Sequence, residues 1–165
     1  MKSSYSKDKF IFLMQLKSRA EKEESSYARL LFQENIISYL LMATLFTIEL
    51  LLNQQNTKLV LTNERKLKTE HILKIKFEPK MIEPKTLGQL CAVINPFLEN
   101  HIDLKLLLKS FVDMRNDITH KMFRKYENME EVEHDSKKIV KIGEKTIKEL
   151  DIFRNKILEE WHPTK

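Results

Sequence analysis

One segment, Ile36 to Leu52, restricts the possible folds more than any other, because Glu49 is its only charged residue. A helix that is apolar on nearly all sides must be covered by other helices or by lipid. The segment is slightly shorter than the roughly 20 apolar residues of a membrane span, and it carries several hydroxyl side chains. We therefore expect a central helix over residues 27–53 that is buried in protein, partly by a second copy of the chain, and no membrane span.

Residues that interrupt helices are scarce, since the 165 residues include two glycines and four prolines. Sheets need tight turns, which depend on Gly and Pro, whereas the abundant Leu, Ile, Lys and Glu favour helices. The sequence thus predicts an all-α fold in a single domain over residues 1–165, a bundle of about four to six helices. Cys91 is the only cysteine and the N-terminus lacks a signal-peptide pattern, so we expect a cytoplasmic protein.

The first half of the chain predicts two helices and one ambiguous segment. Helices are expected over residues 7–24 and 27–53, and Ser25-Ser26 either caps the second helix or lies inside one continuous helix. A polar break is expected at residues 53–56. The segment near 57–85 suits an irregular link or a short β-hairpin inserted into the bundle, and equally a helix over part of its length.

Capping residues predict where the later helices begin. Thr86 opens a capping box for a helix that ends at about Ile94, before a proline. Asp103 is expected to cap the next helix, and Asn128 the last one. The last helix extends toward Trp161 and carries one apolar stripe (Val132, Ile139, Val140, Ile147, Leu150, Ile157, Leu158 and Trp161).

A glycine inside that last helix points to a close helix crossing. Gly143 lies in the middle of the predicted helix, where glycine costs stability relative to alanine. We expect another helix to approach closely at this position.

The stretch Met114–Phe123 combines Arg115, Asn116 and His120 between an apolar helix and a basic segment. Arginine presents a planar fork of donors that suits phosphate, and histidine can move a proton near neutral pH. Together they predict binding or cleavage of a phosphodiester. On one straight helix Arg115 and His120 would lie about 140° apart around the axis. Convergence of the two side chains therefore requires either a break in the helix or two copies that face each other across a twofold axis.

The pattern Arg115-Asn116-x-x-x-His120, set in a short helical chain, resembles the R-N-x-x-x-H signature of HEPN domains. The resemblance implies a HEPN-like helical bundle, usually a homodimer, with its active site in the dimer cleft. Many HEPN domains are metal-independent RNases of toxin–antitoxin, abortive-infection and CRISPR systems, and others are inactive. The resemblance therefore implies cleavage of RNA without a metal or another cofactor.

The chemistry of such a site assigns a role to each side chain. His120 takes the proton of a ribose 2′-hydroxyl or returns one to the leaving oxygen. Arg115 holds the scissile phosphate and stabilises its developing charge, and Asn116 orients His120 or binds the phosphate. Further candidates are three basic residues for the RNA backbone and two secondary polar residues (Lys121, Arg124 and Lys125; Asp117 and Thr119).

Other functions are compatible with the same residues. The net charge of +5 permits an anionic partner without requiring one. The main alternative is a catalytically inactive helical module that binds a protein such as a nucleotidyltransferase-type antitoxin. Asp113, Asp117 and His120 share one helical face as a weaker metal-binding patch, but no ligand from a second helix is evident. DNA binding by a helix-turn-helix would need a short glycine-containing turn that the sequence lacks. We expect RNA or a nucleotide as ligand, and a homodimer formed through residues 27–53 and the motif region.

Overall fold

The computed structural model describes residues 7–62 and 86–161, and these residues are helical almost throughout. Five α-helices and one 3-10 helix follow one another: α1 Lys7–Lys22, α2 Ser26–Thr62, α3 Leu87–Ile94, η2 Asn95–Leu98, α4 Ile102–Lys125 and α5 Met129–Trp161. No strand occurs in the described ranges. The prediction of an all-α bundle of about four to six helices is confirmed.

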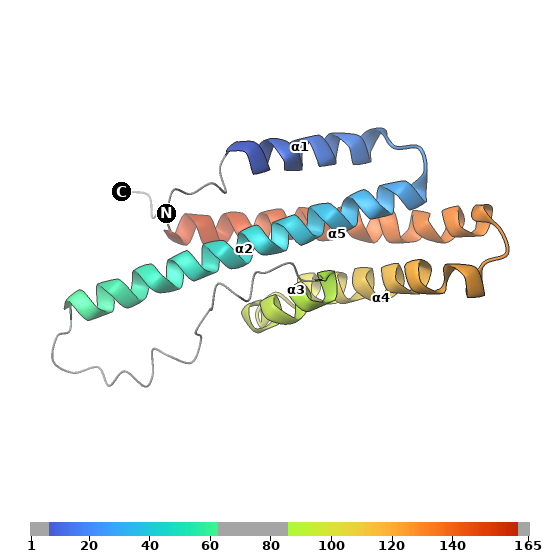
Figure 1. The fold of residues 1–165 in the computed structure, drawn as a ribbon. Coiled ribbons are helices and arrows are strands. Elements are labelled where there is room, and N and C mark those ends of the chain that lie inside the picture. The colour runs from blue at the N-terminus through green and yellow to red at the C-terminus, as the bar shows by residue number, and fades with distance from the viewer. Residues whose placement is uncertain (1–6, 63–85, 162–165) are drawn as a thin grey trace.

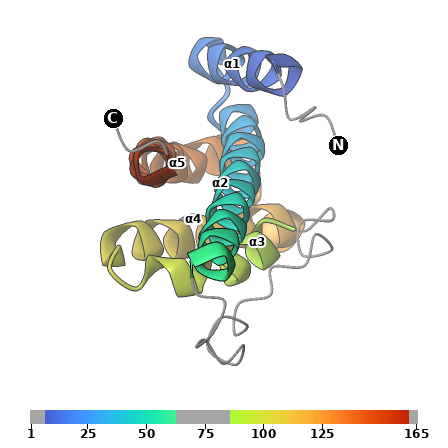
Figure 2. The same cartoon turned by 90° about the vertical axis from the view of Figure 1, so that its left-hand side faces the viewer.

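The long helix α2 lies at the centre of the bundle. It runs beside α5 in the same direction, while α1 and α4 run in the opposite direction (Figure 1). Seen roughly along its axis, α2 has α1 above it, α5 to its left, and α3 and α4 below it (Figure 2). Its buried apolar side chains form much of the core (Leu30, Ile36, Ile37, Leu40, Leu41, Leu45 and Ile48). The prediction of a central buried helix is confirmed, and α1, α3 and α5 of the same chain supply much of the cover.

Helix α2 is longer than the sequence predicted. The polar break expected at residues 53–56 is wrong, because the helix continues to Thr62. Asn and Gln are only mildly unfavourable inside a helix, and this stretch holds neither Gly nor Pro. The alternative of a β-hairpin near 57–85 is wrong for residues 57–62, which are helical, and residues 63–85 lie outside the described ranges.

The apolar character of α2 also bears on membranes. Among the described residues one segment, Ser26–Leu52, is long and apolar enough to cross a membrane, and half of its most apolar window is buried inside the bundle. The buried core helix of a globular protein meets the same criterion of length and composition.

A carboxylate from α5 caps the start of α2 and separates it from α1. The two helices are distinct, because α1 ends at Lys22 and α2 begins at Ser26. Glu133 of α5 accepts hydrogen bonds from Ser25 Oγ at 2.5 Å and from the backbone N–H groups of Ser26 and Tyr27 at 2.6 and 3.3 Å. These N–H groups would otherwise lack a partner in the first turn. The loop between α1 and α2 is thereby fixed to α5.

Side chains of α2 and α4 pack directly against Gly143 of α5, where the sequence predicted a close helix crossing. A Cβ atom added there would lie 2.2 Å from Gln33 Oε1 and 2.9 Å from Phe111 Cε2. Both distances are far below van der Waals contact, so a larger residue at position 143 would displace Gln33 or Phe111. Gln33 is 2% exposed and donates from Nε2 to the Val140 carbonyl at 3.1 Å, which fixes its amide against α5.

The predicted starts of the later helices are confirmed in two cases and wrong in one. Thr86 and Gln89 form the full capping box of α3. Asn128 Oδ1 accepts from the Glu131 N–H at 3.0 Å at the start of α5. Asp103 does not cap α4, because the helix begins at Ile102 and Asp103 lies in its first turn. An acidic residue there still interacts favourably with the helix dipole.

Most of the stripe predicted for α5 is buried. Val132, Ile139, Val140, Leu150 and Ile157 belong to the core, together with Phe153, which the predicted stripe omitted. Ile147 and Leu158 are partly buried, and the side chain of Trp161 is outside the described set.

Candidate functional site

All residues of the Arg-Asn-His motif lie on one regular helix. Helix α4 continues without interruption from Ile102 to Lys125, so the alternative that the helix breaks inside the motif is wrong. Arg115 and His120 are five residues apart and therefore point about 140° away from each other. Within one chain the two side chains do not converge on a common phosphate.

Arg115 faces α2 and forms a paired contact with Glu34. Its Nε donates to Glu34 Oε2 at 2.7 Å, and its Nη2 donates to Glu34 Oε1. The two side chains are 21% and 19% exposed, so this ion pair is sheltered but still reaches solvent. A planar guanidinium that meets both oxygens of one carboxylate is held in a defined orientation.

Asn116 holds the third nitrogen of the same guanidinium. Its Oδ1 accepts from Arg115 Nη1 at 2.9 Å. The amide oxygen is thus directed at Arg115, while the prediction had it orient His120 or bind phosphate. Thr119, a secondary candidate, donates from Oγ1 to the Arg115 carbonyl oxygen at 2.9 Å, which is a contact within the helix.

His120 lies on the outer side of α4 and is exposed. It follows Asn116 by four residues, so the two side chains are neighbours on one face of the helix. Across the described residues no hydrogen bond or ion pair engages the His120 ring. The ring is therefore accessible to a ligand or to another molecule.

The basic residues that follow the motif divide into two groups. Lys121 and Lys125 both donate to Asp117, at 2.6 and 2.7 Å, and Lys125 also lies 3.6 Å from Asp135. The hydrogen bonds from Lys121 and Lys125 lower the pKa of the Asp117 carboxyl to about 2. Arg124 is exposed, and no ion pair with another described residue engages it. Arg124 is thus the predicted RNA-contacting residue whose charge is least compensated locally.

Other reactive groups of the described chain give no alternative centre. Within residues 7–62 and 86–161, no group of three or more His, Cys, Asp or Glu side chains is arranged to hold a metal ion. The face that carries Asp113, Asp117 and His120 is therefore not a preformed metal site. Burial raises the pKa of the Cys91 thiol to about 12, so this thiol stays protonated near neutral pH and is a poor nucleophile.

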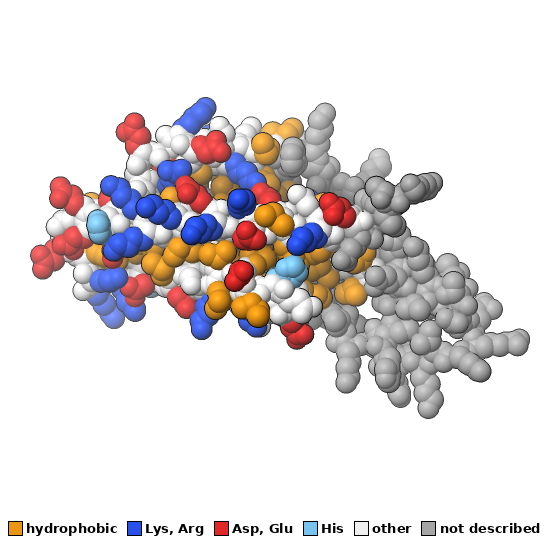
Figure 3. All heavy atoms as spheres, turned by 180° about the vertical axis from the view of Figure 1, so that it is seen from behind, with side chains coloured by type: hydrophobic (Ala, Val, Ile, Leu, Met, Phe, Trp, Pro, Cys, Tyr) orange, Lys and Arg blue, Asp and Glu red, His pale blue; other side chains and the backbone are white. Residues whose placement is uncertain are grey.

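Apolar side chains share the exposed face of α4 with His120. Ile102 and Leu106 are 64% and 56% exposed. At about 100° per residue, both lie within about 40° of His120 around the helix axis. Hydrophobic side chains also reach the surface between the charged rows of α5 and α4 on the side of the molecule drawn in Figure 3.

The fold and the site define an all-α helical bundle that carries a sheltered Arg–Glu–Asn cluster and an exposed histidine on one helix. Comparison of the chain with family models, with curated proteins and with solved structures finds no significant match. Sequence reasoning found Arg115, Asn116 and His120 but missed Glu34. Glu34 lies 81 residues before Arg115 on a different helix, so no local pattern connects the two residues.

Proposed function

We propose that the protein is a HEPN-like, metal-independent endoribonuclease of the cytoplasm that acts as a homodimer, with its active site in a cleft between two α4 helices. The observation that carries the proposal is the Arg115–Asn116 cluster beside an accessible His120 on the same helix. Arginine and histidine supply phosphate binding and proton transfer, which are the two functions that cleavage of RNA by its own 2′-hydroxyl requires.

The unbroken helix supports a composite site. Because Arg115 and His120 of one chain point about 140° apart, they act on one phosphate only if the second residue comes from another copy. A twofold axis beside α4 brings His120 of one protomer toward Arg115 of its partner and repeats the same arrangement on the other side. Such an axis has to lie at the edge of α4 between the two side chains, because Arg115 faces α2 and His120 faces outward.

The exposed face of α4 supports contact with a second copy. Ile102 and Leu106 offer apolar surface that a twofold contact would cover. They lie within about 40° of His120 around the axis but about 21 to 27 Å from it along the helix, so an interface that includes all three has to extend along most of α4. Helix α2 can contribute to the same contact, because half of its most apolar window lies outside the buried core. The proposed dimer therefore uses the motif region of α4 together with residues 27–53.

The side chains of the cluster fit phosphate binding. A guanidinium has five N–H donors, and Glu34 and Asn116 engage three of those of Arg115. The two that remain can donate to the oxygens of a phosphodiester. Glu34 acts as a positioning residue that holds the fork in place, and its negative charge reduces the affinity of Arg115 for anions in general.

The proposed reaction balances without a bound metal. His120 accepts the proton of the ribose 2′-hydroxyl, and the resulting oxygen attacks the adjacent phosphorus. The bond from phosphorus to the 5′-oxygen breaks, and this oxygen takes a proton from an imidazolium. Arg115 stabilises the charge that develops on the phosphoryl oxygens. The products are a 2′,3′-cyclic phosphate and a 5′-hydroxyl.

Cleavage of a mixed RNA substrate in excess EDTA tests this function. The wild-type protein is expected to cleave, and the His120→Ala and Arg115→Ala variants are expected to be inactive. An equimolar, refolded mixture of the two variants should recover about a quarter of wild-type activity, since half of the dimers then contain one intact composite site. No recovery from folded variants would contradict the composite site, and full activity of His120→Ala would contradict the mechanism.

A second function is favoured by the contact between Glu34 and Arg115. Because this carboxylate neutralises the arginine, the cluster equally suits an inactive helical module that binds a protein, such as a nucleotidyltransferase-type antitoxin. The exposed apolar side chains of α4 would then contact that partner. This alternative predicts that the protein neither binds nor cleaves RNA, and that Arg115→Ala leaves partner binding unchanged while Leu106→Asp abolishes it.

A further inference from the structure

The outer face of α5 carries a row of four lysines, the basic stripe (Lys137, Lys141, Lys145 and Lys148). All four side chains are exposed. At about 100° per residue they lie within a band of about 80° around the helix axis, and they extend over about 16 Å along it. Figure 3 shows Lys and Arg side chains gathered along this helix, above the apolar side chains that reach the surface between α5 and α4. The stripe belongs to a different helix from the Arg-Asn-His motif.

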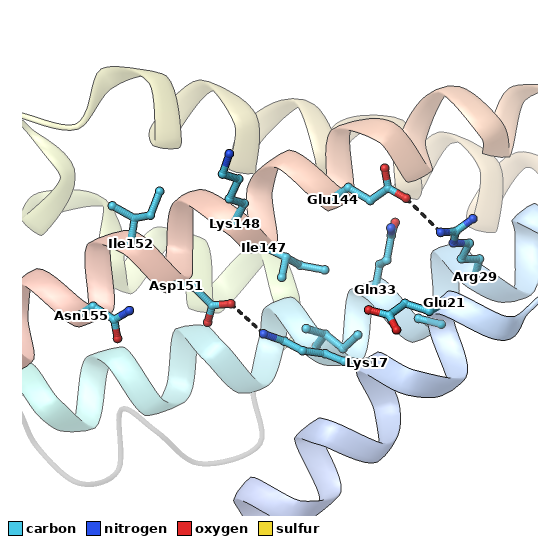
Figure 4. A pocket seen from close by; sticks show the side chains of 12 residues that line it. Lys17, Glu21, Arg29, Gln33, Glu144, Ile147, Lys148, Asp151, Ile152 and Asn155 are labelled. Carbon is cyan, nitrogen blue, oxygen red and sulfur yellow. Dashed lines mark hydrogen bonds and ion pairs between the residues drawn. The ribbon is translucent and has the colours of Figure 1, made fainter.

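Carboxylates on the neighbouring face of α5 are directed toward α1 and α2. Glu144 contacts Arg29 of α2 at 3.1 Å, and Asp151 contacts Lys17 of α1 at 2.7 Å. Figure 4 shows these two ion pairs, and it shows that Lys148, which lies between them on α5, points away from both. The charges of these two carboxylates are thus used to hold the bundle together.

Local spacing alone would have neutralised the two ends of the basic stripe. Glu133 precedes Lys137 by four residues and Glu144 precedes Lys148 by four, which is the favourable order for an ion pair on a helix. Glu133 instead caps the start of α2, and Glu144 instead binds Arg29. Across residues 7–62 and 86–161, no ion pair engages any lysine of the stripe. Its four charges can therefore be used by an anion from outside the bundle.

Acidic residues limit the basic stripe at both ends, and this bears on the shape of its partner. Glu130 and Glu159 lie within the same band of α5, about 10 Å before Lys137 and about 16 Å after Lys148. Both carboxylates are exposed. A flat anionic membrane that met the stripe would also meet them, whereas a narrow polyanion that crosses the middle of α5 would not. A nucleic-acid strand is a polyanion of this shape.

The residue types of the stripe suit contact with a phosphate backbone rather than with bases. A lysine ammonium is a compact charge on a flexible stem, so it can follow a phosphate into several positions. Contacts to phosphate position a strand but carry no sequence information directly. Residues 137–148 include no aromatic side chain on which a base could stack. The stripe therefore predicts binding that depends on charge and salt, with little preference for sequence.

We propose that the basic stripe binds the phosphate backbone of single-stranded RNA along α5, outside the composite cleft on α4. The identity of the nucleic acid rests on the proposed function, because the strand that is cleaved at α4 is the strand that α5 holds. An unpaired strand fits best, since attack by a 2′-hydroxyl needs a backbone that is free to align. The stripe supplies affinity and takes no part in the chemistry.

Binding of a fluorescein-labelled oligouridylate to the His120→Ala variant tests this proposal, because this variant leaves the probe uncleaved under the proposed mechanism. Fluorescence anisotropy across a salt series gives the affinity and its dependence on salt. Adding Lys141→Gln and Lys145→Gln together should weaken binding about tenfold at low salt. It should also reduce the slope of log affinity against log salt by about 1.4, which corresponds to two phosphate contacts. Glutamine preserves the helix propensity of these exposed positions.

The double variant Lys22→Gln with Lys138→Gln is the matched control, since it removes the same net charge from two exposed lysines outside the stripe. Lys138 is already paired with Asp135 at 3.2 Å. The control should weaken binding by less than about threefold and change the slope by no more than about 0.5. Equal losses in the two double variants, or no binding of RNA by His120→Ala itself, would overturn the stripe as an RNA site.

Two further measurements separate this proposal from the proposed function. If the wild-type protein binds RNA through the stripe without cleaving it, the stripe is supported and only the nuclease activity is contradicted. If the wild-type protein cleaves RNA and the loss of Lys141 and Lys145 leaves the rate unchanged at low substrate concentration, only the stripe is contradicted. Vesicles of anionic phospholipid should not bind through the stripe. Vesicle binding that depends on these lysines, without RNA binding, would overturn the proposal in favour of a membrane surface.

Discussion

Gln33 and Glu34 are neighbours on α2, but Gln33 packs against α5 whereas Glu34 forms an ion pair with α4. Gln33 is almost fully buried and occupies the space that Gly143 of α5 leaves free. Glu34 is partly exposed and pairs with Arg115 of α4. The first contact is dictated by packing, because no larger residue fits opposite Gln33. The second is not, because neither charged side chain fills a core position or pairs with a backbone group.

This difference distinguishes residues that the fold requires from residues that are available for a functional site. A residue whose polar atoms serve a helix crossing or a helix end is explained by the fold alone. The ion pair of Glu34 with Arg115 has no such explanation, since a partly exposed pair contributes little net stability. Residues that the fold does not require are the better candidates for a site, and the variants below test that distinction.

The largest effect is expected at the packed crossing. Gly143→Ala should lower the free energy of unfolding by about 2 kcal/mol, because the new methyl group collides with Gln33 and with Phe111. Gly88→Ala is the matched control, since a Cβ there meets Val112 Cγ1 only at 4.0 Å. The control should be neutral or slightly stabilising. Urea denaturation measures the free energy of unfolding of both variants. Equal losses in the two would contradict the role given to tight packing at Gly143.

The ion pair should behave differently when both of its members are replaced. Glu34→Gln alone should cost about 1–2 kcal/mol, because it leaves the charge of Arg115 sheltered and unpaired. The double variant Glu34→Met with Arg115→Met should return to within about 1 kcal/mol of the wild type, since apolar side chains can replace such a pair. Denaturation of all three variants measures this. RNA cleavage, if present in the wild type, should be absent from the double variant.

The cap of α2 should give a smaller effect that depends on pH. Burial opposes ionisation of Glu133, but the hydrogen bonds from Ser25, Ser26 and Tyr27 outweigh it, so the pKa of this carboxyl is lowered from 4.5. The stability that ionised Glu133 contributes is complete above its ordinary pKa and is lost as the pH falls through the lowered value. Glu133→Gln should therefore cost about 1 kcal/mol at pH 7, and this cost should shrink as the pH falls below 4.5 and through the lowered pKa of Glu133.

The control for this cap is Glu130→Gln in the first turn of α5, which is exposed. It should change stability by no more than about 0.5 kcal/mol at pH 7. If Glu133→Gln lost the same stability at every pH, the shape of the Glu133 side chain rather than its charge would account for the capping of α2.

Local rules predicted most of the fold. Two glycines and four prolines indicated helices throughout, Thr86 and Asn128 marked two helix starts, and Gly143 marked a close crossing. Each of these depends on residues within a few positions or on the special sterics of glycine. The polar residues at 53–56 were over-weighted, because polarity without Gly or Pro does not end a helix whose neighbours stabilise it.

Long-range pairs could not be predicted in the same way. Glu133 caps a helix that starts more than 100 residues earlier, and Glu34 binds an arginine on a different helix. Which charged residue meets which depends on the order and rotation of the helices in the bundle. The sequence left open whether the helix breaks inside the motif, and the divergence of the motif residues on an unbroken α4 makes the candidate site depend on a second copy.

The smallest effect is expected among the basic residues after the motif, where exposure alone does not decide the contribution to RNA affinity. Asp117 already compensates Lys121 and Lys125, whereas no described residue forms an ion pair with Arg124. Arg124→Ala should therefore lower affinity for single-stranded RNA about threefold and reduce the slope of log affinity against log salt by about 0.7, whereas Lys121→Ala should change both by less. Asp117→Asn frees both lysines and should raise affinity. Fluorescence anisotropy across a salt series measures all three, and a decrease in Asp117→Asn would mean that Asp117 orders the lysines for RNA rather than neutralising them.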